Sequence, residues 1–193
     1  MTATTVFTPC LVLSLRRQYH SCHIQLPDSN ERVAAIAIHN EYYSLFQVIE
    51  SPAQAIDMAI RLSTRGEAVA IRQLPVGGYA LWVKETNARP TRSFSLIERR
   101  STRHPKPASC YIFTARNQYQ SVEITVPDLD QSLLAVQVQG HYYSLFKPQA
   151  TAEQTLELTA KLAQRGDETV ILALPEQAPH YSICVFEPDA MPR

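Results

Sequence analysis

The chain has 193 residues, 45% of them hydrophobic and 19% charged, so it is long and apolar enough to bury a core. Basic and acidic residues are equal at 18 each, which argues against broad binding of nucleic acid or a membrane surface. No run of about 18 apolar residues occurs, and the start MTATTVFTPCLVLSL lacks a signal-peptide pattern. We therefore expect a cytoplasmic protein without a membrane segment.

The sequence matches itself when it is displaced by 100 residues. The segment CLVLSLRRQYHSCHIQLPD aligns with CYIFTARNQYQSVEITVPD, and YYSLF occurs in both halves. The alignment has no gap from Cys10 to Pro75, and about a third of its positions are identical. This match predicts a duplicated module, with one copy at 8–86, a basic linker at 87–107 and a second copy at 108–190.

Alternating hydrophobicity predicts the first strands of each copy. A strand at the start of the copy is followed by one over 19–26, where Cys22 and Ile24 alternate with polar residues. A third strand ends before Asn40, which aligns with Gly140, and both residue types tolerate a positive φ angle. We therefore expect a tight turn there, with YYSLF as the returning strand of a hairpin.

Within YYSLF, alternation places Tyr42, Ser44 and Phe46 on one face of the strand. Tyr43 and Leu45 then lie on the other face. A large aromatic side chain on each face indicates that neither face is simply solvated. We expect Leu45 and one of the tyrosines to lie in the core.

One helix is predicted in each copy, over about 52–65 and 152–165. Ser51 and Thr151 are typical N-cap residues, and a glutamine three residues later predicts a capping box in both copies. Gly66 and its counterpart in the second copy end these helices, because glycine readily adopts the left-handed cap.

Two further strands, at about 68–74 and 79–85, follow the helix, and the second copy repeats them. Each module therefore reads β-β-β-β-α-β-β, an α+β fold with a mostly antiparallel sheet and one helix. One helix cannot cover both faces of such a sheet. We therefore expect two tandem homologous repeats packed as a pseudo-two-fold pair. Two independent domains on a linker are the alternative.

Charge is distributed unevenly along the chain. Residues 86–109 hold six basic residues and one acidic residue, a net of +5, whereas residues 110–193 hold five basic and ten acidic residues, a net of −5. We interpret the basic segment as a solvated linker. The alternatives are that its Arg99, Arg100 and Arg103 dock a partner protein or anionic polymer, or that they bind nucleic acid.

No stretch carries a catalytic, metal or nucleotide-binding signature. HSCH at 20–23 fits no standard zinc spacing, and neighbouring strand residues point to opposite faces. The four cysteines are dispersed, so we expect reduced and mostly buried thiols. We expect no cofactor and no metal. The enzyme question stays open, with a non-catalytic role favoured.

The candidate binding residues in the two copies are two tyrosines and one arginine of each: Tyr42, Tyr43, Tyr142, Tyr143, Arg16 and Arg116. The three linker arginines named above are further candidates. Tyrosine combines apolar area with a polar tip, which suits a groove or a partner-binding face. The arginines would supply polar specificity at its rim. Alternatively, these aromatic side chains only fill the core and the contact between modules.

These features favour a binding or adaptor protein of regulatory or scaffolding type, which recognises a protein partner through its duplicated module. The first alternative is a small-molecule-binding protein or enzyme with a site between the copies. His39, His141, the two arginines and the paired tyrosines would then line one cavity. The second alternative is nucleic-acid binding through the linker. Assembly into a homo-oligomer is left open.

Overall fold

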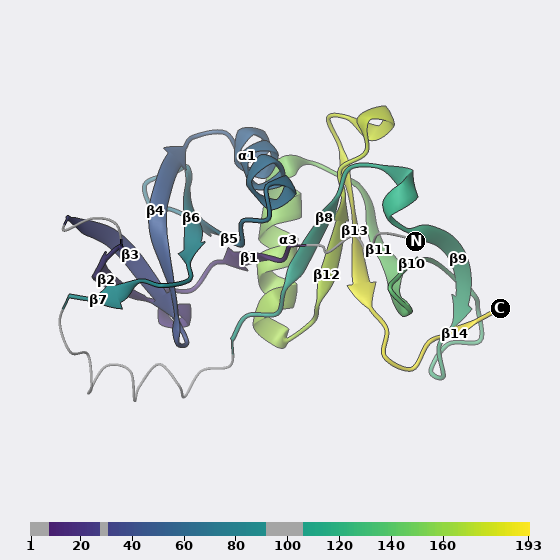
Figure 1. Cartoon of the computed structure of the whole chain (residues 1–193). Coiled ribbons are helices and arrows are strands. Elements are labelled where there is room, and N and C mark those ends of the chain that lie inside the picture. Colours follow the sequence, from purple (N-terminus) through teal and green to yellow (C-terminus); the bar gives the residue numbers. More distant parts are fainter. Residues whose placement is uncertain (1–7, 28–30, 92–105) are drawn as a thin grey trace, which may run out of the picture. The chain divides into compact units, whose positions relative to one another are not determined.

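The chain forms two compact units, unit 1 up to Pro107 and unit 2 over Ala108–Arg193 (Figure 1). The structure is a computed structural model and describes residues 8–27, 31–91 and 106–193. These residues form two α-helices and mostly antiparallel strands, so the expected α+β class is confirmed. In the described ranges, no helix combines the length and apolar character needed to cross a membrane.

Unit 1 is a mostly antiparallel sheet that packs against one helix (Figure 1). Its elements in chain order are β1 (Cys10–Leu13), β2 (His20–Gln25), β3 (Arg32–Ile38), β4 (Glu41–Ile49), α1 (Pro52–Thr64), β5 (Val69–Gln73), β6 (Tyr79–Glu85) and β7 (Arg89–Pro90). The strand order is β1-β5-β6-β4-β3-β2-β7, in which β1 and β5 run parallel. The β7 strand comes from the segment predicted as linker.

Unit 2 has the same order of major elements along the chain. They are β8 (Cys110–Phe113), β9 (Gln120–Thr125), β10 (Leu133–Val138), β11 (His141–Ala150), α3 (Ala152–Arg165), β12 (Thr169–Leu172), β13 (Tyr181–Phe186) and β14 (Met191–Pro192). The strand order is β8-β12-β13-β11-β10-β9-β14, in which β8 and β12 run parallel. The β14 strand lies beyond the predicted end of the second copy.

Local sequence signals account for the ends of both helices. The Ser51 hydroxyl accepts a hydrogen bond from the Gln54 N–H, and in α3 Thr151 and Gln154 form the full capping box. Gly166 has a φ angle of 93°, the left-handed cap that was predicted.

The predicted hairpin turn is confirmed, because β3 and β4, like β10 and β11, are joined by two residues. Gln139 and Gly140 both have positive φ angles, of 50° and 86°, as a type I′ turn requires. In unit 1, His39 has a φ angle of 53°. Asn40, where the sequence suggested a positive φ angle, is not among the residues that have one, so in unit 1 the residue before it takes this conformation.

The expectation that Leu45 lies in the core is wrong, since Leu45 is 38% exposed. The expectation that one tyrosine of YYSLF lies in the core is confirmed at Tyr43. Leu45 pairs with Trp82, and the next paired residue of β4 is Gln47, so Phe46 is the extra residue of a β-bulge. The bulge interrupts the alternation of faces, and both Leu45 and Phe46 become exposed.

In each unit the sheet forks beside the long strand that contains YYSLF, which is β4 in unit 1 and β11 in unit 2. In unit 2, β11 pairs with β13 from Tyr143 onward and with β10 only up to Ser144, while Leu134 of β10 pairs with β9. In unit 1, β4 leaves β3 after Ser44 in the same way. In unit 2, Ile183 of β13 packs in a cluster with Leu162 of α3, so its neighbours Ser182 and Cys184 lie on the face of the sheet that does not carry the helix.

Candidate functional site

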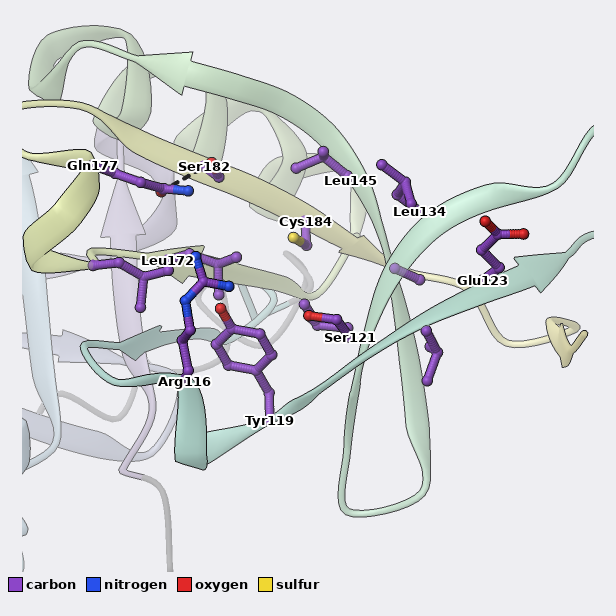
Figure 2. A pocket seen from close by; sticks show the side chains of 14 residues that line it. Arg116, Tyr119, Ser121, Glu123, Leu134, Leu145, Leu172, Gln177, Ser182 and Cys184 are labelled. Atoms are coloured by element: carbon purple, nitrogen blue, oxygen red, sulfur yellow. Dashed lines mark hydrogen bonds between the residues drawn. The ribbon is translucent and has the colours of Figure 1, made fainter.

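The fork of unit 2 contains a pocket of about 360 Å³, which we call the fork pocket (Figure 2). Its wall is mainly apolar and includes one residue from the turn before β9, one from each of β10, β11 and β12, and two from β13: Tyr119, Leu134, Leu145, Leu172, Ser182 and Cys184. A volume of this size suits a drug-sized molecule or a large side chain.

Curvature of the sheet creates the pocket. In a flat sheet, the four strand spacings from β12 to β9 would amount to about 19 Å. Residues of both strands nevertheless line one pocket, because the bulged and forked sheet is coiled. The Tyr119 side chain lies on the β9 side of the hollow and Leu172 on the β12 side (Figure 2).

Polar groups lie at the rim of the fork pocket. Arg116 Nε lies 2.7 Å from Glu176 Oε1, and both side chains are exposed. The Ser182 hydroxyl donates a hydrogen bond to Gln177 Oε1 at 3.3 Å. The rim can therefore give polar contacts to a group whose apolar part enters the pocket.

The thiol of Cys184 is an apolar part of this wall. Burial raises the pKa of Cys184 to about 12. The group therefore stays protonated at neutral pH and does not supply a thiolate nucleophile. As predicted, all four cysteines are free thiols and buried.

In unit 1, Trp82 takes the position that Cys184 has in unit 2. Trp82 pairs with Leu45 and with Ala70, and Cys184 pairs with Leu145 and with Val170. The Trp82 side chain is only 9% exposed and belongs to one buried cluster with Tyr19, Ile36 and Tyr43. The chain's own indole therefore fills this place in unit 1.

Two arginines close the same place in unit 1. The guanidinium carbons of Arg16 and Arg72 lie 4.7 and 4.9 Å from the centre of the Tyr19 ring. Both distances suit a cation–π contact. In unit 2 the residue that corresponds to Arg72 is Leu172, a wall residue of the fork pocket.

Among the predicted binding residues that the structure describes, Arg116 lines the fork pocket. The tyrosines of YYSLF instead make hydrogen bonds and packing contacts within their own units. Tyr43 is buried and donates a hydrogen bond to Glu41, and Tyr143 is buried and donates one to Glu168 at 2.5 Å. Tyr142 accepts a hydrogen bond from Gln137 at 3.3 Å. Tyr42 is half-buried in a cluster that contains Cys22 and Ile24.

Binding through the linker arginines stays a prediction. Arg99, Arg100 and Arg103 lie outside the described residues. A site between the copies, with His39 and His141, also stays a prediction. Within the described ranges, no group of three or more His, Cys, Asp or Glu side chains is placed to hold a metal ion.

A charged cluster in unit 1 surrounds Glu41. The Lys84 and Lys106 amines lie 2.6 and 2.7 Å from its two carboxylate oxygens. Burial raises the pKa of Glu41, but the hydrogen bonds from Lys106 and Lys84 outweigh it and lower the pKa to about 2. The carboxylate therefore stays ionised well below its ordinary pKa of 4.5.

Glu41 should make the stability of unit 1 depend on pH. Since its pKa is lowered in the folded chain, its contribution is complete above pH 4.5 and is lost as the pH falls toward about 2. We expect Glu41→Gln to lower the free energy of unfolding by less than about 1 kcal/mol at neutral pH, because these pairs are partly exposed. Chemical denaturation at several pH values should show this difference disappearing near pH 2. A constant difference for Glu41→Gln would contradict the assignment.

The wall of the fork pocket was missed by the sequence analysis, although one signal for it exists. The segment YALWVKE aligns with YSICVFE, so a tryptophan in the first half of the sequence aligns with a cysteine in the second half. A change from a very large to a small side chain at a buried position leaves space unless a neighbour fills it.

Comparison with known proteins adds no relative. No protein-family model matches this chain, and neither the curated proteins nor the solved structures contain a significant match.

Proposed function

We propose that this chain is a non-catalytic binding protein of regulatory or scaffolding type, and that it recognises a protein partner through the fork pocket of unit 2. The observation that carries the proposal is an apolar pocket of about 360 Å³ with exposed leucines beside it. Leu134 is 65% exposed and lines this pocket. Exposed apolar side chains gathered around a hollow are typical of sites where proteins bind one another.

The proposal includes an origin by duplication of one module. Two features support it, namely the same order of major elements and the same strand order within each unit. A side-chain hydrogen bond also recurs, from Ser44 to Glu85 and from Ser144 to Glu187. The packing of the copies as a pseudo-two-fold pair stays a prediction.

The charge of unit 2 favours a protein partner over nucleic acid. Residues 110–193 have a net charge of −5, which repels a phosphate backbone and attracts a basic segment. Nucleic-acid binding through the linker, and a small-molecule site between the copies, remain alternative hypotheses.

Selection from a library of random peptides displayed on phage tests the proposal. We expect the wild-type protein to enrich peptides that Leu134→Asp does not enrich, because a carboxylate at the pocket wall would be desolvated by an apolar ligand. Leu129→Asp is the matched control, since Leu129 is 51% exposed and is not among the pocket residues. Failure to enrich any peptide that depends on Leu134 would contradict the proposal.

A further inference from the structure

We propose that the group bound in the fork pocket is an indole, the side chain of a tryptophan in the partner protein. This inference rests on the proposed function and gives the chemistry of its ligand. The chain itself carries the argument, because unit 1 places its own tryptophan where unit 2 has the pocket.

The two places correspond residue by residue. Trp82 and Cys184 each pair with the leucine of YYSLF on one side, and with the second residue of the strand after the helix on the other. Both side chains therefore project from the same position of the sheet, toward the face that does not carry the helix.

The surroundings of the two places are also alike. In unit 1, Trp82 lies in one buried cluster with Tyr19 and Ile36. The corresponding residues of unit 2, Tyr119 and Val136, line the fork pocket. A tyrosine ring and a branched aliphatic side chain thus surround an indole in one unit and a hollow in the other, and contact between two aromatic rings stabilises a complex beyond the apolar area that it buries.

Smaller side chains leave the fork pocket of unit 2 open where unit 1 is filled by Trp82. A side chain that fills this pocket would therefore come from a partner. Cysteine at position 184 is far smaller than tryptophan, and Leu172 replaces the arginine that stacks on Tyr19 in unit 1. Phe113 occupies the position of Leu13 and stacks on Tyr119, with ring centres 6.2 Å apart. Even with this larger residue, about 360 Å³ stays open.

The indole N–H has polar partners within reach at the rim. In unit 1, Trp82 Nε1 is buried without a hydrogen-bond partner among the described residues, so packing holds this indole. In unit 2, the hydroxyl of Ser182 and the amide of Gln177 line the pocket. A tryptophan that entered from outside could donate its N–H to one of these oxygens.

Three synthetic peptides test the inference. Each has a fluorescein label and two lysines on either side of a Gly-X-Gly centre, in which X is tryptophan, leucine or alanine. The lysines complement the acidic unit. In fluorescence anisotropy with the full wild-type chain, we expect the tryptophan peptide to bind at least tenfold more tightly than the leucine peptide, and the alanine peptide to bind more weakly still.

The outcomes separate this inference from the proposed function. A leucine peptide that binds as tightly as the tryptophan peptide would overturn the indole assignment and leave the proposed function intact. Pocket-dependent phage peptides without any aromatic residue would do the same. If no phage peptide depends on Leu134, the proposed function fails and the inference fails with it.

Discussion

Replacing Cys184 with tryptophan is expected to abolish binding of any peptide selected through the fork pocket, with a loss of affinity of at least 100-fold, or about 2.7 kcal/mol. The new indole would occupy the hollow as Trp82 does in unit 1 and would exclude the ligand. Titration calorimetry with a selected peptide, on the wild type and on Cys184→Trp, measures the effect.

A control must separate filling of the pocket from loss of the fold. The pocket has room, so we expect Cys184→Trp to change the free energy of unfolding by no more than about 1–2 kcal/mol, toward the lower end of the range for overpacked cores. Cys184→Ala keeps the residue small and apolar and should retain binding within a few fold. Full affinity in a folded Cys184→Trp protein would refute the assignment of the site.

Replacing Trp82 with alanine is expected to lower the free energy of unfolding by about 3–5 kcal/mol, because it removes a large buried side chain and leaves a cavity. Trp82 is 9% exposed and packs in the cluster that contains Tyr19 and Tyr43. Since it is also the single tryptophan of the chain, unfolding should be followed by circular dichroism rather than by its fluorescence.

The matched control for this variant is Val76→Ala, at a residue that is 93% exposed. It should change the free energy of unfolding by less than about 0.5 kcal/mol. A loss below about 1 kcal/mol for Trp82→Ala would show that the indole is not part of a well-packed core. Trp82 would then give no support to an indole as the group bound in the fork pocket.

Much of the fold could be predicted, because its signals are local. A cap residue with glutamine three positions later, as at Thr151, and a glycine at the end, as at Gly166, define a helix within a few residues of sequence. The hairpin turn before YYSLF is equally local. These elements match the structure closely.

The fork and its pocket could not be predicted in the same way. The bulge at Phe46 is set by how β4 pairs with β6, a strand that lies more than 30 residues away. Simple alternation therefore placed Leu45 in the core, whereas the bulge exposes it. The pocket depends on residues of five strands that meet through coiling of the sheet, and no single stretch of sequence records that arrangement.

The most direct test of the central claim is the map of amide chemical-shift changes when a selected peptide is added to ¹⁵N-labelled wild-type protein. We expect the largest changes around the fork pocket, at Tyr119, Leu145 and Cys184. The corresponding residues of unit 1, Tyr19, Leu45 and Trp82, should change little. The largest changes on α3 or in unit 1 would contradict the claim that the fork pocket is the binding site.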